Sequence, residues 1–210
     1  MKILVIGSGG REHALVWKIK QSPKVEKIYC APGNGGIAQD AECVDIKADN
    51  IEELKKFVKS KKIDLTIVGP EAPLVTGIVD AFVKEGLKIF GPTKAAAQLE
   101  GSKVFTKEFL NRWNIPTGAF QTFENLKDAK DFLEQASFPI VVKAEGLAAG
   151  KGVFICETSK QAREAVDQIM SDKVLKEAGK RIIVEEFLEG VEASILAISD
   201  GESYVVLEPS

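Results

Sequence analysis

The sequence is poor in the residue types that build disulfide frameworks and metal clusters. Its 210 residues include three cysteines and one histidine, His13. The cysteines are odd in number, irregularly spaced and not matched by a histidine cluster, so the sequence predicts neither a disulfide framework nor a zinc site. Such cysteine usage is typical of a reducing compartment, and we expect a cytoplasmic protein.

The sequence also lacks an excess of one charge and any long apolar run. Its 28 basic and 31 acidic residues give a formal net charge of −3, whereas a nucleic-acid-binding protein would carry a basic stripe. The first apolar run, residues 3–6, is far too short for a signal peptide or a membrane span. We therefore expect neither a nucleic-acid partner nor a membrane association.

Short apolar runs alternate with amphipathic stretches through the first hundred residues. Strands are expected at residues 3–6, 27–30, 65–68 and 89–90, and helices at residues 11–21, 51–59 and 74–84. This alternation predicts an α/β fold with a doubly wound parallel sheet, in which ligands bind at the carboxyl ends of the strands. We interpret residues 1–101 as a substrate-binding domain of this type.

The pattern changes after Gly101 to a mixed α+β unit. Helices are expected at residues 103–113, 126–135 and 160–170, and strands at residues 119–123, 153–156 and 181–185, with a further strand that carries Lys143. A hairpin is expected from residues 193–198 and 204–207. Because a hairpin needs a partner sheet or helix to be stable, we expect the chain to be the front part of a longer protein.

Glycine-bearing turns follow the first three expected strands, at residues 7–10, 31–36 and 69–71. The first turn opens a helix, where free backbone N–H groups and the helix dipole favour an anion such as a substrate phosphate. A dinucleotide fingerprint would need glycine at Glu12 and a carboxylate after the second strand, so NAD binding is not predicted. The turn could also be a tight connection without a ligand. Glu71 could bind a sugar hydroxyl or an amine, or cap the following helix.

Residues 141–153 combine two lysines with a loop of small residues between two strands. Glycine and alanine let the backbone approach a polyanion, and Lys143 and Lys151 supply positive charge. The spacing differs from that of a Walker loop and predicts a flap over nucleotide phosphates. The alternative is a flexible hairpin with solvated lysines. Residues 185–192 then suit an adenine edge and a ribose diol, or form a solvated acidic turn.

Taken in order, these segments resemble the ATP-grasp superfamily and, within it, the phosphoribosylamine–glycine ligase family. The motifs are residues 7–14, 32–36, 69–71, 99–103 and 143–153, followed by the acidic segment 185–192. The resemblance implies an amino-terminal pre-ATP-grasp domain at residues 1–101. It further implies an ATP-grasp lid subdomain with its connecting helix at residues 102–188, and the incomplete start of a second subdomain at residues 189–210.

The resemblance also implies an activity and a set of site residues. The family joins glycine to 5-phosphoribosylamine through a glycyl phosphate, using ATP with magnesium or manganese, in purine biosynthesis. By motif match, Lys143 and Lys151 would be catalytic, and Gly9, Gly10, Asn34 and Glu71 would bind phosphoribosylamine. The nucleotide would be held by Lys103, Lys143, Gly146, Gly150, Lys151, Gly152, Glu185, Glu186, Leu188 and Glu192.

Two departures from the family pattern qualify this reading. Val191 stands where the family commonly has a second glutamate. The family also runs to about twice this length, and its metal ligands and glycine contacts are expected downstream of Ser210, so we expect the 210 residues alone to be inactive. The full-length protein is expected to be a monomer or a weak homodimer. The alternatives are another ATP-grasp carboxylate–amine ligase, a non-catalytic nucleotide-binding module and, last, a dehydrogenase.

Overall fold

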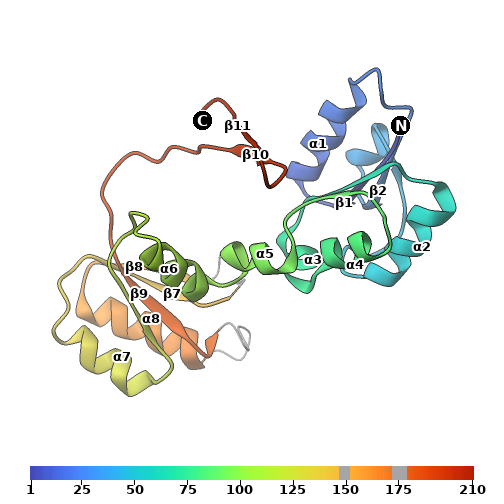
Figure 1. Cartoon of the computed structure of the whole chain (residues 1–210). Coiled ribbons are helices and arrows are strands. Elements are labelled where there is room, and N and C mark those ends of the chain that lie inside the picture. Colours follow the sequence, from blue (N-terminus) through green and yellow to red (C-terminus); the bar gives the residue numbers. More distant parts are fainter. Residues whose placement is uncertain (147–151, 172–178) are drawn as a thin grey trace. The chain divides into compact units, whose positions relative to one another are not determined.

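The computed structural model describes residues 1–146, 152–171 and 179–210, which divide into two compact units (Figure 1). The first unit contains Met1–Pro116 and the segment that begins at Glu145. The second contains Thr117–Ala144 and the described residues from Gly152 onward. None of the helices in these described ranges is long and apolar enough to cross a membrane.

The first unit is an alternation of strands and helices. Its elements are β1 (Lys2–Gly7), α1 (Gly10–Lys20), β2 (Lys27–Pro32), the 3-10 helix η1 (Ile37–Gln39), β3 (Glu42–Cys43), α2 (Ile51–Lys61), β4 (Leu65–Val68), α3 (Glu71–Thr76), α4 (Ile78–Lys84), β5 (Ile89–Phe90), α5 (Lys94–Gly101) and α6 (Lys103–Arg112). The four strands expected from the sequence are confirmed. The short β3 and the helix α5 were not expected.

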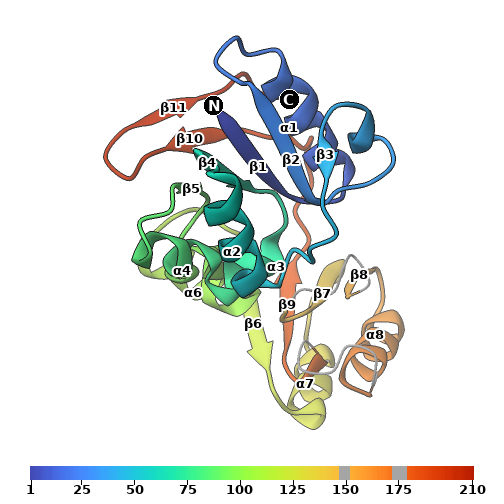
Figure 2. The ribbon, with the colours of Figure 1, turned by 90° about the vertical axis from the view of Figure 1, so that its right-hand side faces the viewer.

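In the described part of this unit, five parallel strands form one sheet in the order β3-β2-β1-β4-β5 (Figure 2). Side chains alternate between its two faces, and each face has its own core. One core joins Leu4 and Ile6 of β1 to Leu54 of α2 and Phe82 of α4. The other joins Ile3 and Val5 of β1 to Val16 of α1. Helices therefore cover both faces, which confirms the doubly wound α/β fold.

The prediction of a single helix over residues 74–84 is wrong. The structure has two helices there, because Gly77 adopts a left-handed conformation with φ of +98° and ends α3. Its N–H group donates to the carbonyl oxygens of Pro73 and Leu74, at 3.2 and 3.0 Å. Glycine takes this conformation without the steric penalty of a Cβ atom, so the chain turns and α4 begins at Ile78.

The second unit is built on an antiparallel sheet. Its elements are β6 (Phe120–Phe123), α7 (Leu126–Leu133), β7 (Ile140–Ala144), β8 (Val153–Cys156), α8 (Ser159–Ser171), β9 (Ile182–Glu186), β10 (Ala197–Ser199) and β11 (Tyr204–Val206). Among the described strands, the order of the main sheet is β6-β9-β7-β8. The helices α7 and α8 pack side by side and bury apolar residues such as Leu133, Val166 and Ile169 (Figure 1). The expected α+β character is confirmed.

The expected hairpin is present, but its first strand is shorter than predicted. β10 and β11 pair antiparallel around a turn in which Asp200 accepts the N–H groups of Glu202 and Ser203. Residues 193–196 lie outside β10, although Ser194 exchanges two backbone hydrogen bonds with Ser210. Pro209 has no N–H group to donate to the ladder, which accounts for the interruption between this pair and β11.

Candidate functional site

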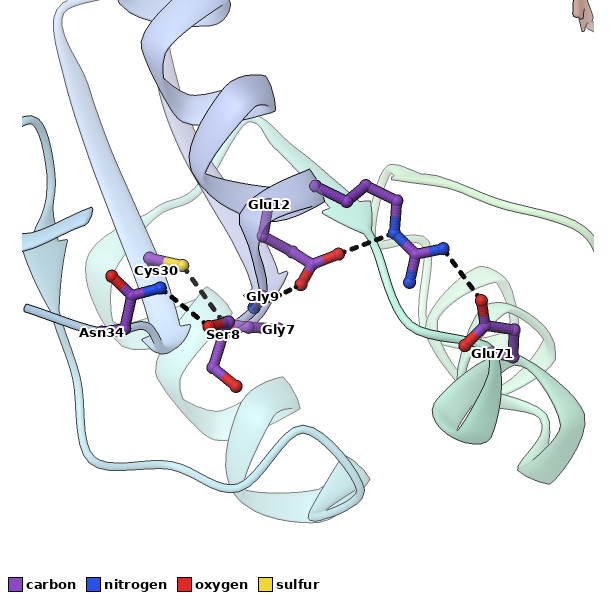
Figure 3. A network of polar contacts seen from close by, with 8 residues as sticks. Gly7, Ser8, Gly9, Glu12, Cys30, Asn34 and Glu71 are labelled. Atoms are coloured by element: carbon purple, nitrogen blue, oxygen red, sulfur yellow. Dashed lines mark hydrogen bonds and ion pairs between the residues drawn. The ribbon is translucent and has the colours of Figure 1, made fainter. Parts of the chain in front are cut away.

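Glu12 is a buried carboxylate in the first turn of α1, beneath the loop that follows β1. The residue is 3% exposed. Its Oε2 atom accepts the N–H group of Gly9 at 2.7 Å, and its Oε1 atom accepts the Nε–H group of Arg11 at 2.8 Å (Figure 3). A carboxylate in the first turn is further stabilised by the helix dipole. Glu12 thus fixes the shape of the loop at residues 7–10.

Arg11 extends this network to the end of a second strand. Its Nη1 atom lies 2.8 Å from Oε1 of Glu71, the first residue of α3 after β4. The hydrogen bond from Arg11 holds the pKa of Glu71 below its usual value, and the two carboxylates raise the pKa of Arg11. Glu12, Arg11 and Glu71 therefore link the loops that follow β1 and β4 (Figure 3).

Two glycines of these loops make room for the Glu12 side chain. A Cβ atom on Gly69 would lie 2.1 Å from Glu12 Oε1, and one on Gly7 would lie 2.6 Å from its Cγ atom. Gly10 differs, because a Cβ atom there would meet no heavy atom within 4 Å. In the sequence, Glu12 is notable only as the residue at which a dinucleotide fingerprint would have glycine. Its position three residues after Gly9 is the spacing of a capping box, which is the signal that could have identified it.

Asn34 links the loop after β2 to the loop after β1. Its Nδ2 atom donates to the carbonyl oxygen of Ser8 at 2.8 Å (Figure 3). Its Oδ1 atom accepts the N–H groups of Gly36 and Ile37, at 2.8 and 2.9 Å. The ring of His13 lies against Gly36, where an added Cβ atom would come within 2.8 Å of its Cε1 atom. Asn34 and His13 thus position the second glycine loop.

A cleft of about 400 Å³ lies beside this network in the first unit. Its polar lining comes from Arg11, Glu71 and Glu100, and Leu74 and Val75 supply apolar surface. One guanidinium between carboxylates suits a ligand that carries amine or hydroxyl donors better than a bare anion. Of the four predicted substrate residues, Glu71 lines this cleft, whereas Gly9, Gly10 and Asn34 lie in the adjoining loops.

In the second unit, Lys143 of β7 and Glu185 of β9 form an ion pair. The Lys143 Nζ atom lies 2.8 Å from Glu185 Oε2, and the two side chains are 27% and 8% exposed. Lys143 is opposite Ile183 in the antiparallel register, and Glu185 is two residues further along the same strand face. The sheet geometry therefore brings these two predicted residues together.

The other residues of the predicted adenine and ribose segment have different surroundings. Glu186 pairs with Ala119, because its carboxylate accepts the Ala119 N–H group at 3.0 Å and its own N–H group donates to the Ala119 carbonyl at 2.9 Å. The side chain of Leu188 is exposed. Glu192 is exposed and, within the described part of the chain, forms no hydrogen bond or ion pair. The structure does not bring Glu192 into contact with Lys143 or Glu185.

Lys103 lies at the start of α6, where Glu145 forms a second carboxylate cap. Oε2 of Glu145 accepts the N–H group of Val104 at 3.0 Å, and its Oε1 atom accepts the hydroxyl group of Ser102. The Lys103 Nζ atom donates to the carbonyl oxygen of Gly146 at 2.9 Å. The structure thus brings Lys103 and Gly146 together in the first unit. Glu145 lies within the motif at residues 143–153, but the motif offered no reason to assign it a role.

The glycine loop is described only at its two ends. The carbonyl oxygen of Gly152 accepts the Ala144 N–H group at 2.7 Å, next to the pairing of β7 with β8. Gly150 and Lys151 lie outside the described residues. In the ranges that are described, no group of three or more His, Cys, Asp or Glu side chains could hold a metal ion.

Both parts of the chain match known families. Residues 1–100 match the family model described as phosphoribosylglycinamide synthetase, N domain, and residues 101–210 match the ATP-grasp (A) domain of the same synthetase.

Three individual relatives that resemble this chain share the same name, phosphoribosylamine–glycine ligase. The phosphoribosylamine–glycine ligase of Clostridium acetobutylicum is 54% identical over 205 residues, which cover 98% of this chain and 49% of the relative. That of Caldanaerobacter subterraneus is 55% identical over 207 residues, which cover 99% and 50%. The crystal structure of the Thermotoga maritima ligase superposes with a TM-score of 0.81 at 28% identity, covering 100% of this chain and 49% of that one. The chain thus spans about half the length of the relatives it matches.

Proposed function

Because the chain belongs to the phosphoribosylglycinamide synthetase family, we propose that the protein containing it joins glycine to 5-phosphoribosylamine in purine biosynthesis. In this reaction, the γ-phosphoryl group of ATP moves to a carboxylate oxygen of glycine and ADP leaves. The amine nitrogen then attacks the carbonyl carbon, phosphate leaves with the C–O bond electrons, and a proton is lost as the amide forms.

The observation that carries this proposal is the Lys143–Glu185 pair. Catalysis of phosphoryl transfer depends mainly on positioning the reacting groups and neutralising the phosphate charge. Glu185 holds the Lys143 ammonium group in place on strand β7, which is paired on both sides and lies just before the glycine loop. A lysine held in this way suits nucleotide phosphates, and Lys103 and Lys151 would add charge. The backbone of Gly146, Gly150 and Gly152 would allow close approach and help to exclude water.

The adenosine end of ATP would lie along the segment that follows β9. The carboxylates of Glu185 and Glu186 already have the partners Lys143 and Ala119, so these residues would contact adenine mainly through backbone groups. The exposed Leu188 offers an apolar surface for the base. The exposed carboxylate of Glu192 is able to accept hydrogen bonds from ribose hydroxyl groups.

Phosphoribosylamine would bind at the linked loops of the first unit. Glu71 would accept hydrogen bonds from its amine or sugar hydroxyl groups in the cleft beside Arg11. Asn34 would hold the second loop in place. Gly9 and Gly10 would contribute backbone and open space, since the Gly9 N–H group is already donated to Glu12.

A magnesium or manganese ion, when bound, would neutralise phosphate charge. The described residues do not fit such a site, because they contain no suitable cluster of ligands. Because the chain spans about half the length of its relatives, we propose that the metal ligands lie beyond Ser210, and we derive no step through the ion. We also propose a functional boundary at residue 101, in keeping with the family models, which meet between residues 100 and 101. The protein is proposed to act in the cytoplasm on small molecules.

The proposal is tested by measuring ADP release from the full-length protein with glycine and 5-phosphoribosylamine, each omitted in turn. We expect release only when both are present, with glycinamide ribonucleotide identified by mass spectrometry. Lys143→Met should abolish turnover, and the 210-residue chain alone should show none. Faster turnover with another carboxylate or amine would favour a different ATP-grasp ligase. ATP binding without turnover under any condition would favour a nucleotide-binding module.

A further inference from the structure

Two cysteines stand side by side beneath the glycine loops of the first unit. Cys30 of β2 and Cys43 of β3 are direct partners in the parallel register. Both side chains belong to the same apolar cluster and therefore face the same side of the sheet. Neighbouring strands lie about 4.8 Å apart, within the range of Cα separations that a disulfide spans. Both thiols are free.

Each thiol supports the backbone of a different loop. The Cys30 Sγ atom lies 3.4 Å from the carbonyl oxygen of Gly7, to which it donates (Figure 3). The Cys43 Sγ atom lies 3.6 Å from the carbonyl oxygen of Asn34 and donates to it. A disulfide has no S–H group, so forming one would remove both hydrogen bonds together.

The contact with Gly33 is closer still. A Cβ atom on Gly33 would lie 2.4 Å from Cys43 Sγ and 3.5 Å from Cys30 Cβ. Both cysteines therefore lie next to the Cα atom of Gly33, beneath the loop. The Cys43 sulfur thus packs directly against Gly33, which adopts a left-handed conformation with φ of +74°, so a new bond at this sulfur would alter that packing.

We propose that Cys30 and Cys43 are a site of reversible thiol oxidation that loosens the loop at residues 33–37. Cys43 is half-buried and reacts first: its thiolate attacks one oxygen of hydrogen peroxide, the O–O bond breaks, and hydroxide leaves and takes up a proton to become water, so that Cys43 becomes a sulfenic acid. Cys30 then loses its proton and its thiolate attacks the Cys43 sulfur; the S–S bond forms, the S–O bond breaks, and the leaving hydroxide takes up that proton and departs as a second water molecule. Burial raises the pKa of Cys30 to about 12, which makes this second step slow.

The test is peptide mapping of the intact protein under non-reducing conditions after treatment with hydrogen peroxide. Cleavage after Asp40 or Glu42 separates the two cysteines, and we then expect one cross-linked species that joins the peptides containing Cys30 and Cys43, lacks two hydrogens and is reversed by dithiothreitol. Cys156→Ser is the matched control, because Cys156 is also buried but lies on β8 of the second unit. It should leave the cross-link intact, whereas Cys43→Ser and Cys30→Ala should each abolish it. A stable adduct on Cys43 without the cross-link would refute the pairing.

Hydrogen exchange supplies a readout that does not depend on the proposed activity. Amides of residues 33–37 should exchange several-fold faster in the oxidised protein than in the reduced protein. Peroxide-treated Cys156→Ser should show the same change, and treated Cys43→Ser should show none relative to its untreated form. A cross-linked protein with unchanged exchange in this loop would refute the link between the thiols and the loop.

Discussion

Lys143 and Glu185 lie diagonally across the antiparallel pair formed by β7 and β9, with Nζ and Oε2 2.8 Å apart. The Glu185 side chain is almost fully buried, whereas part of the Lys143 side chain remains open to solvent. The pair therefore has a structural consequence, and we propose that it also contributes to ligand binding.

Lys143→Met should weaken the second unit and nucleotide binding together. Glu185 would lose the ammonium group that its buried carboxylate contacts, at a cost in the free energy of unfolding of about 1–3 kcal/mol. Adding Glu185→Met should recover much of that stability, because the buried charge is then gone. ATP affinity should stay low in both variants. Urea unfolding and calorimetric ATP titration measure the two effects, and recovery of ATP affinity in the double variant would contradict the binding role of Lys143.

Gly69→Ala should be far more damaging to stability than Gly10→Ala. The new methyl group on residue 69 would lie 2.1 Å from Glu12 Oε1, whereas that on residue 10 meets nothing within 4 Å. Overpacking costs about 1–3 kcal/mol, while alanine at the start of α1 is neutral or favours the helix by up to about 1 kcal/mol. Thermal unfolding compares the variants. Equal melting temperatures would mean that Glu12 readily leaves its place.

Gly10→Ala also separates folding from substrate binding. If the open space at Gly10 receives phosphoribosylamine, the variant should keep its stability while KM for that substrate rises and KM for ATP stays unchanged. Steady-state kinetics of the full-length protein give both constants. Unchanged kinetics would remove Gly10 from the proposed substrate site.

Glu71 should titrate below the ordinary glutamate value of about 4.3. The hydrogen bond from Arg11 lowers its pKa in the folded state, so the stabilisation it provides is present above the unfolded pKa and is lost as the pH falls through the folded one. Arg11→Met should move the NMR titration midpoint of Glu71 upward. The shift should be partial, because the N–H group of Glu71 itself also lowers that pKa. An unmoved midpoint would contradict the coupling.

Sequence periodicity predicted the main strands because each is a short apolar run between turn residues. It did not predict β3, which is two residues long, or the break at Gly77, where one left-handed glycine divides a continuous apolar pattern. Nor did periodicity or the motif match predict the ion pair of Lys143 with Glu185, since it depends on strands that are 42 residues apart in the chain. The roles of the individual site residues and the boundary at residue 101 stay predictions.

Glu12 shows why the polar network was harder to predict than the fold. The role of Glu12 depends on Gly69, which follows a different strand. Because Gly69 has no side chain, it leaves the space that Glu12 fills. In a local pattern, by contrast, Glu12 is only a residue that breaks a glycine fingerprint. Contacts between loops that follow different strands depend on tertiary structure, so they are difficult to predict from a single sequence.

Glu12→Gln should therefore destabilise the first unit although it preserves volume. The amide oxygen is able to keep one hydrogen bond, but the charge that holds Arg11 is lost, and we expect a cost of about 1–3 kcal/mol in the free energy of unfolding. Glu52→Gln is the matched control, because Glu52 pairs with Lys55 while its side chain is 75% exposed, and such surface pairs contribute at most about 1 kcal/mol. Urea unfolding of both variants gives the comparison. A Glu12→Gln protein as stable as the control would mean that the buried carboxylate does not hold the loops after β1 and β4 in place.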